Sequence, residues 1–303
     1  RRAIRALSSE RRCVAIDHVG CGLSDKPADF HYTLAEHVAN LERLVLALDL
    51  ERIHLVVHDW GGPIGLGFAR RHPGRIARLT ITNTAAFPLD GALPLRLAAC
   101  RWPVFGALAI RGCNAFARAA TRMAVERPLD PLVKRGYLLP YDSWANRIAT
   151  HEFVRDIPLA LGDAAFEELA AIERELVLFR AVPVQILWGA RDFVFTTRFL
   201  GEWRRRFPRA RVACWEDAGH YLFEDRADDF VAALRGGLVA PMGGRHTARQ
   251  EGDLLANRPW HGRDRHEGGS ANQAGERGRL QARQDHRAGD PGRGRLVGGA
   301  AVA

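Results

Sequence analysis

The sequence predicts an α/β protein with a mostly parallel sheet, helices on both faces, and a helical cap inserted between two strands. Short, continuously apolar segments alternate with segments of helical spacing along residues 1–240. Strands that are apolar throughout are typical of a parallel sheet buried between helices. One apolar segment, 53–57, ends in polar residues followed by two glycines, a layout typical of a sharp strand-to-helix turn.

The individual elements follow from local patterns. A helix is predicted over 33–48, where apolar residues recur at helical spacing, with Thr33 as N-cap and Glu36 completing a capping box. A second helix is predicted over 62–71, directly after the polar turn. The predicted strands are 13–17, 53–57, 75–82, 183–188 and 211–215.

These elements divide the chain into four parts. Residues 1–87 and 183–240 are predicted to form the two halves of the sheet-containing core. Residues 88–182 interrupt the strand–helix alternation with helical, proline-rich sequence and are predicted to form the cap. Because ligands of open α/β sheets bind at the carboxyl edge of the strands, the cap is expected to cover that edge.

The last part, 241–303, has a different composition. It holds 13 of the 30 glycines, 11 arginines and one aromatic residue, Trp260. Such a segment cannot bury enough apolar surface to offset its ordering entropy, so it is predicted to be a disordered or out-of-frame tail.

Composition excludes several classes of function. Lys26 and Lys134 are the only lysines, so the net charge of +9 comes from arginine and indicates GC-rich coding more than nucleic-acid binding. Five scattered cysteines without Cys-x-x-Cys, and no His-Glu-x-x-His, predict no metal, no cofactor and a cytoplasmic location. No apolar run reaches the roughly 18 residues of a transmembrane segment.

The polar turn supplies a candidate nucleophile, Asp59. A carboxylate suits attack on an electrophilic carbon that carries a leaving group, with an ester as the intermediate. Asp192 follows the strand at 183–188 and His220 follows the strand at 211–215, which is the chain order nucleophile, acid, histidine. His220 is predicted to be the general base and Asp192 the residue that orients it.

The sequence leaves open the roles of several other residues near the three candidate catalytic positions. The backbone N–H of Trp60 can contribute to an oxyanion hole, and its indole N–H can face a leaving group. The acid could lie elsewhere than at Asp192, but the other position, after the strand at 75–82, holds the uncharged Asn83. Tyr137 and Tyr141 of the cap either pack or polarise a substrate oxygen, and His58 is interpreted as structural.

Several motifs carry a family resemblance. His58-Asp59-Trp60-Gly61-Gly62, with an upstream Gly-Leu-Ser-Asp-Lys-Pro at 22–27, resembles the haloalkane dehalogenase branch of the α/β-hydrolases. Segments at 82–87, 114–116, 140–147 and 156–159 resemble the β-lactone decarboxylases of bacterial long-chain olefin biosynthesis. The resemblance covers residues 1 to about 240.

The resemblance implies decarboxylation of a cis-3,4-dialkyl-2-oxetanone, a β-lactone, to a cis-alkene and CO2. It assigns Asp59 as nucleophile, Asp192 as acid, His220 as base and Trp60 as the oxyanion-side residue, and leaves the attacked lactone carbon open. It further implies a hydrophobic long-chain substrate and assembly with olefin-pathway synthase and synthetase enzymes. The alternatives are a haloalkane dehalogenase acting through an alkyl-enzyme ester, and an inactive fragment.

The resemblance also marks departures at the N-terminal side. Members of the family carry three more N-terminal strands and a His-Gly-Asn-Pro loop whose Asn is a second oxyanion donor, and neither occurs in this sequence. The third of those strands would lie between 13–17 and 53–57. We therefore expect an N-terminally truncated chain with a gap in its sheet, insoluble or inactive when isolated.

Overall fold

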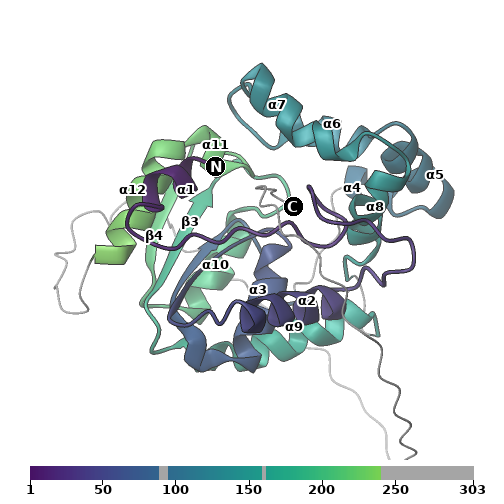
Figure 1. The fold of residues 1–303 in the computed structure, drawn as a ribbon. Helices are drawn as coiled ribbons and strands as arrows, with labels where there is room; N and C mark the ends of the chain where they lie inside the picture. Colours follow the sequence, from purple (N-terminus) through teal and green to yellow (C-terminus); the bar gives the residue numbers. More distant parts are fainter. Residues whose placement is uncertain (89–94, 159–161, 240–303) are drawn as a thin grey trace, which may run out of the picture. The chain divides into compact units, whose positions relative to one another are not determined.

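The computed structural model describes residues 1–88, 95–158 and 162–239 (Figure 1). The chain divides into a unit that contains residues 1–242 and a second unit over 243–297, and only the first contains described residues. The predicted tail at 241–303 lies outside the described residues.

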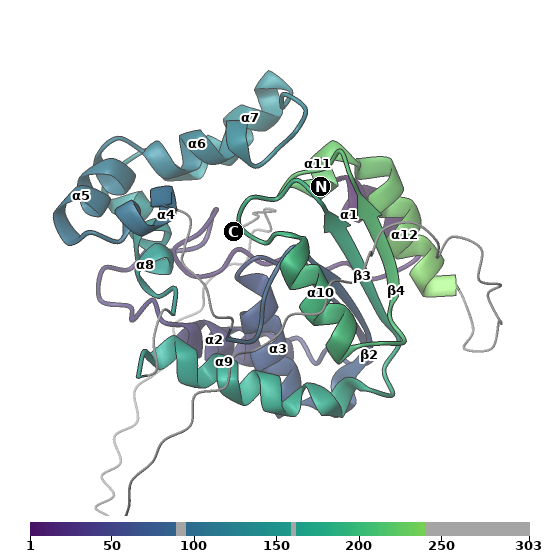
Figure 2. The same ribbon diagram turned by 180° about the vertical axis from the view of Figure 1, so that it is seen from behind.

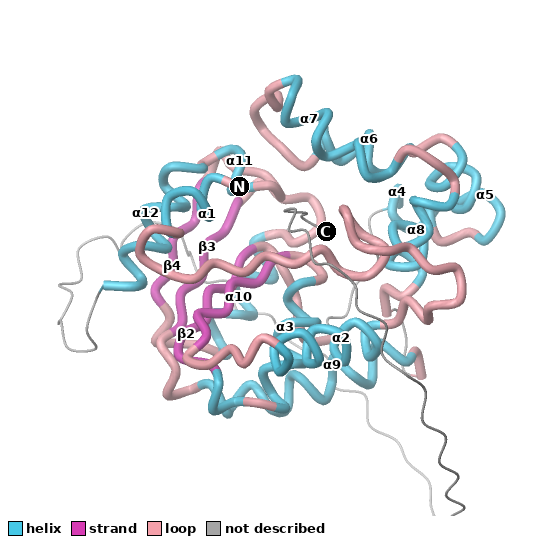
Figure 3. The backbone as a smooth tube through the Cα atoms, viewed as in Figure 1, coloured by secondary structure: helices cyan, strands magenta, loops and turns pink. Residues whose placement is uncertain are grey.

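A parallel sheet forms the centre of the described unit (Figure 3). Its strands follow the spatial order β1-β2-β3-β4 and are parallel throughout. Four predicted strands are thereby confirmed to within one residue at each end. The strands are β1 (Ile53–His58), β2 (Ile76–Thr82), β3 (Val184–Gly189) and β4 (Arg211–Trp215).

The fifth predicted strand, 13–17, is wrong. This segment is a loop in the structure and pairs with none of the four strands. Extended backbone becomes a strand only when a neighbouring strand pairs with its N–H and C=O groups, and apolar composition alone cannot supply that neighbour. Asp17 instead holds the following turn: its side chain accepts a hydrogen bond from Leu23 N, and its carbonyl accepts one from the Ser24 hydroxyl.

Helices cover both faces of the sheet (Figures 1 and 2). On one face Ile186 and Trp188 of β3 join a large apolar core with α2 (Leu34–Ala47), α3 (Gly61–Arg71), α9 (Ala164–Glu175) and α10 (Thr197–Arg206). On the other face Leu187 packs with α1 (Arg2–Leu7), α11 (Leu222–Asp225) and α12 (Ala227–Val239). The alternation along β3 confirms a sheet buried on both sides.

The start of α2 is capped partly as predicted. The Thr33 hydroxyl accepts a hydrogen bond from Glu36 N at 3.4 Å, which confirms Thr33 as N-cap. The reciprocal half of the capping box is wrong, because Thr33 N donates to the His31 carbonyl at 2.7 Å and is not free for the Glu36 side chain. A carboxylate from the inserted segment, Asp156, accepts from Leu34 N at 2.8 Å.

The described parts of the segment between β2 and β3 consist of helices and helical turns joined by loops. Pro103 and Pro131 stand at the first turns of α5 and α7, where proline starts a helix without losing a hydrogen bond. The last helix of the predicted cap range, α9, packs against α2 and α3 beside the sheet. The other helices are α4 (Leu95–Cys100), α5 (Pro103–Ala107), α6 (Ala115–Met123), α7 (Pro131–Leu138) and α8 (Ile148–Arg155), with a π-helical turn at Leu108–Gly112 and 3-10 turns at Leu139–Tyr141, Ala145–Arg147 and Leu176–Phe179.

Within the described residues, no helix is long and apolar enough to cross a membrane.

Candidate active site

Asp59 stands on a sharp turn between β1 and α3. Its φ of 46° lies in the left-handed region, which is uncommon for a residue with a side chain and recurs at functional sites. The two residues that follow β2 hydrogen-bond to the backbone of this turn. Asp59 N donates to the Asn83 carbonyl at 3.1 Å, and the Thr84 hydroxyl donates to the Asp59 carbonyl at 2.5 Å. Position 62 requires glycine, because a Cβ there would meet the Thr84 hydroxyl oxygen at 1.9 Å.

The other two predicted residues lie beside Asp59. His220 Nε2 is 3.2 Å from Asp59 Oδ2, and His220 Nδ1 is 2.7 Å from Asp192 Oδ2. The loops after β1, β3 and β4 supply these side chains, and parallel strands bring their carboxyl ends to one edge of the sheet. The structure therefore assembles Asp59, His220 and Asp192 into one hydrogen-bonded relay.

Asp192 is buried and fully engaged by its surroundings. Its Oδ1 accepts hydrogen bonds from Val194 N at 2.8 Å and Phe195 N at 3.1 Å. Its Oδ2 accepts from Asn83 Nδ2 at 3.0 Å as well as meeting His220. A carboxylate held in this way keeps the proton of the histidine on Nδ1 and leaves Nε2 directed toward Asp59.

Asn83 is a site residue whose positioning role sequence reasoning missed. Asn83 stands at the alternative position for the acid, but its amide nitrogen donates to Asp192 Oδ2 and its amide oxygen accepts from Gly189 N at 2.8 Å. Its backbone carbonyl also accepts the hydrogen bond from Asp59 N, so Asn83 connects the backbone of Asp59 to the carboxylate of Asp192. The signal in the sequence was a polar residue at the carboxyl end of the strand beside β1.

The charge state of His220 follows from its neighbours. Burial acts to lower the pKa of the imidazole, but the Asp192 and Asp59 carboxylates outweigh it and raise the pKa to about 10. His220 is therefore an imidazolium between two carboxylates near neutral pH. In that state Nε2 donates a hydrogen bond to Asp59 and can stabilise negative charge there.

His58 is a neutral neighbour of the relay. Its ring centroid is 4.5 Å from that of His220, and its Nδ1 lies 3.1 Å from the Thr82 hydroxyl. Burial, with a smaller contribution from the charge of His220, holds the pKa of His58 well below its usual range. The residue thus packs beside the imidazolium without adding a second charge, consistent with a structural interpretation.

Asp225 is a second residue that sequence reasoning missed. Its buried carboxylate accepts hydrogen bonds from Gly219 N at 2.8 Å, Glu126 N at 3.0 Å and Arg127 N at 3.1 Å. It thereby joins the loop that carries His220 to the segment after α6. No local pattern distinguishes Asp225 from the other acidic residues near it in the sequence.

The aromatic candidates differ in their surroundings. Trp60 directly follows Asp59 at the start of α3, and its ring centroid lies 5.2 Å from that of Phe153 of α8. The Tyr137 hydroxyl donates to Glu224 Oε1 at 2.9 Å, and the Tyr141 hydroxyl accepts from Gly22 N at 3.4 Å. These contacts occupy both tyrosines with protein partners, as a packing role requires.

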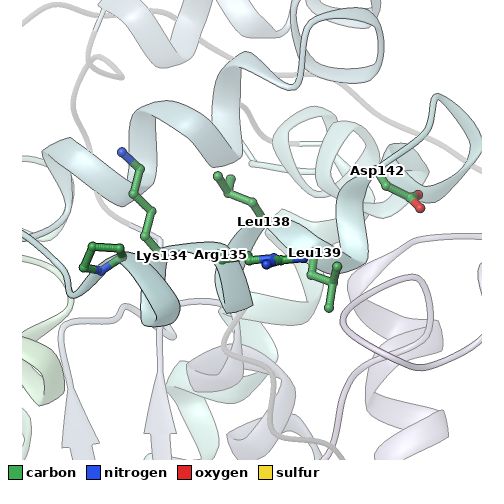
Figure 4. Close-up of a pocket in the computed structure, with 6 residues that line it drawn as sticks. Lys134, Arg135, Leu138, Leu139 and Asp142 are labelled. Atoms are coloured by element: carbon green, nitrogen blue, oxygen red, sulfur yellow. The ribbon is translucent and has the colours of Figure 1, made fainter.

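A separate hollow of about 370 Å³ lies along α7 and shares no residue with the relay (Figure 4). It is lined by Pro131, Lys134, Arg135, Leu138, Leu139 and Asp142.

Across the described ranges, no group of three or more His, Cys, Asp or Glu side chains is arranged to hold a metal ion.

Comparison with known proteins places this chain in a family. A family model described as alpha/beta hydrolase fold matches residues 1–227. The chain is 44% identical over 241 residues to a cis-3-alkyl-4-alkyloxetan-2-one decarboxylase of Shewanella oneidensis, covering 78% of this chain and 76% of the relative. An enzyme of the same name from Xanthomonas campestris pv. campestris is 42% identical over 245 residues, covering 78% and 82%.

Among solved structures, the haloalkane dehalogenase DatA from Agrobacterium tumefaciens C58 superposes with a TM-score of 0.70 at 25% identity, over 78% of this chain and 82% of that one. The fold and the strand-to-helix turn define an α/β-hydrolase. The chain belongs to this family of enzymes and, within it, to the family of the oxetanone decarboxylases.

Proposed function

We propose that this chain decarboxylates cis-3,4-dialkyl-2-oxetanones to cis-alkenes and CO2. The proposal is carried by its 44% identity to the Shewanella relative, whose name states this class of substrate. The Asp59–His220–Asp192 relay supplies groups suited to the chemistry.

In the first step, a carboxylate oxygen of Asp59 attacks C4 of the lactone, the alkyl-bearing sp3 carbon that is bonded to the ring oxygen. The new C–O bond forms as the ring C–O bond breaks, and its electron pair stays on the released carboxylate of the substrate. The product is an alkyl ester of Asp59 with a carboxylate on the adjacent carbon. We favour this carbon over the carbonyl carbon because attack here breaks a bond that must be lost in forming the alkene.

In the second step, the bond between the substrate carboxylate and its carbon breaks and CO2 leaves. Its electron pair forms the C=C bond, and the ester C–O bond breaks to restore the Asp59 carboxylate. No water or proton is consumed. Inversion in the first step followed by anti elimination in the second gives the cis-alkene from the cis-lactone.

The relay has a defined part in this scheme. In place of the general-base role expected from the sequence, we propose that His220, as an imidazolium, donates from Nε2 to Asp59 Oδ2 and stabilises Asp59 as the leaving carboxylate. Asp192 balances the charge and fixes the ring in the proposed role of orienting acid. The backbone N–H of Trp60, the residue after Asp59, is the proposed donor to the negative charge that develops on the substrate.

Products and isotope incorporation test the scheme. The purified chain is given a cis-dialkyl β-lactone in ¹⁸O-water, and separately a 1-haloalkane. We expect cis-alkene and CO2 from the lactone, no ¹⁸O in the peptide that contains Asp59, and no alkene from Asp59→Ala. Such turnover would refute the expectation from the sequence that the isolated chain is insoluble or inactive. Alcohol and halide from the haloalkane without alkene from the lactone would contradict the proposal, since they would indicate a dehalogenase that hydrolyses its ester.

A further inference from the structure

The inserted segment carries a concentrated surface of exposed apolar side chains on α4, α5 and the following π-helical turn, here called the tip. Figures 1 and 2 both show α5 at the outer edge of this segment, away from the sheet. Each apolar member exposes more than half of its surface. The members are Leu95, Trp102, Val104, Phe105 and Leu108.

The tip exposes these side chains from a packed backbone. Gly106 approaches the Cys100 carbonyl so closely that a Cβ would lie 2.0 Å from the oxygen, which fixes α5 against the end of α4. Trp102 and Phe105 contact each other edge to face, with ring centroids 6.3 Å apart. Ile110, two residues beyond Leu108, is 1% exposed and anchors the turn. Ordered exposed apolar groups on this scale mark an interaction surface.

Charge identifies the class of partner. Residues 91–125 contain five arginines and neither aspartate, glutamate nor lysine. Arg118 and Arg122 of α6, next along the chain, are exposed. A partner must therefore accept apolar side chains and carry negative charge. A second copy of the tip would bring like charges together.

We propose that the tip is a peripheral membrane-binding surface that docks on an anionic lipid bilayer. Trp and Phe insert into the boundary between headgroups and acyl chains, while nearby arginines contact the lipid phosphates. Docking would bring the enzyme to the phase in which a dialkyl lipophile dissolves. The binding itself needs no lactone chemistry, so its test is independent of the proposed function.

Vesicle sedimentation tests the proposal with the full chain. We expect binding to vesicles containing phosphatidylglycerol and much weaker binding to pure phosphatidylcholine or at high salt. The double variant Trp102→Ser/Phe105→Ser is expected to bind at least about tenfold more weakly, because it removes the inserting rings. Arg118→Glu/Arg122→Glu is expected to lose about tenfold through charge.

Matched variants distinguish binding through the tip from nonspecific binding through any exposed apolar or charged residue. Leu132→Ser removes a highly exposed apolar side chain from α7, and Arg209→Glu reverses an exposed charge in the loop before β4. Both are expected to bind vesicles like the unaltered chain. The proposal is overturned if the unaltered chain does not bind anionic vesicles, or if these controls lose as much binding as the tip variants. It is also overturned if the tip variants change self-association while vesicle binding stays the same.

Discussion

At the scale of single residues, the site depends on polar groups that carry no catalytic signature of their own. Asp59, Asp192 and His220 can be predicted from the sequence because each follows an apolar strand and their chain order is diagnostic. Asn83 cannot, because its importance comes from three partners on two other strand ends. The sequence shows which residues end each strand, but pairing between strands decides which of them meet.

Asn83→Ala tests this positioning role. Removal of the amide leaves Gly189 N and one lone pair of Asp192 without their partner. Leaving a buried polar group unsatisfied costs about 1–3 kcal/mol of stability. We expect kcat for alkene formation to fall roughly 10- to 100-fold with KM little changed. The pH profile should also shift, because Asp192 would hold His220 less firmly. Unchanged kcat and an unchanged pH profile would show that Asn83 only fills space; Asn83→Ser, which keeps a donor, serves as the conservative control.

The proposed role of His220 predicts an alkaline limit to activity. Although burial opposes protonation, Asp192 and Asp59 raise the pKa of His220 to about 10, so the imidazolium persists through neutral pH. We expect kcat/KM for the lactone to stay flat from pH 6.5 to 9 and to fall toward pH 10. In Asp192→Asn, which removes one stabilising charge, the residual activity should fall at lower pH. Activity that rises through an apparent pKa near 6.5 would instead indicate a neutral histidine acting as base.

At the scale of elements, periodicity predicted what lies within a strand or helix and missed what depends on distant partners. Helix α2 and its Thr33 cap, and strands β1 to β4, follow from local pattern alone. Residues 13–17 have the apolar composition of a strand but no pairing neighbour in the described sheet. Helix α9 has the helical character expected of the cap, yet packs beside α2 and α3, which no local signal could indicate.

Asp225 provides a test at this scale, because it joins two separate loops. Asp225→Ala leaves the N–H groups of Gly219, Glu126 and Arg127 unpaired. We expect the free energy of unfolding to fall by about 3 kcal/mol and kcat to fall with it, because the loop of His220 loses its anchor. Chemical denaturation and kinetics measure both. Asp228→Ala is the control: its carboxylate is almost fully exposed and pairs with the exposed Arg2, so little change is expected. Equal effects from the two substitutions would refute the anchoring role.

At the scale of the whole molecule, several buried or partly buried histidines govern how stability depends on pH. Burial lowers the pKa of His18 to about 4, of His37 to about 3 and of His54 to about 4, and holds that of His58 well below its usual range. The folded chain keeps these rings neutral, whereas the unfolded chain protonates histidine below about pH 6.5. Unfolding therefore takes up protons in acid, and stability falls as the pH drops from 6.5 toward 4.

Two groups act in the opposite sense. Burial raises the pKa of Asp156 to about 6, so this carboxyl binds a proton in the folded chain and adds stability as the pH falls from 6 to 4. The raised pKa of His220 adds stability that is complete below pH 6.5 and is lost as the pH rises toward 10. One acidic group offsets only part of the effect of four histidines. The free energy of unfolding should therefore peak near pH 7, where the protons taken up by the unfolded histidines balance the one released by His220.

His37→Phe isolates one histidine from this balance. Both ring nitrogens of His37 are buried without a hydrogen-bond partner among the described residues, and the ring stacks on Phe153 with centroids 4.6 Å apart. Urea unfolding between pH 4.5 and 6.5 should show uptake of about three protons for the unaltered chain and about one fewer for the variant. The test compares the slopes of the free energy of unfolding against pH, which give the number of protons taken up. A loss of stability from altered packing that is the same at every pH does not change this slope. His31→Phe, at an exposed position, should leave the slope unchanged. An identical slope in His37→Phe would mean that His37 is protonated in the folded chain, which its apolar surroundings argue against.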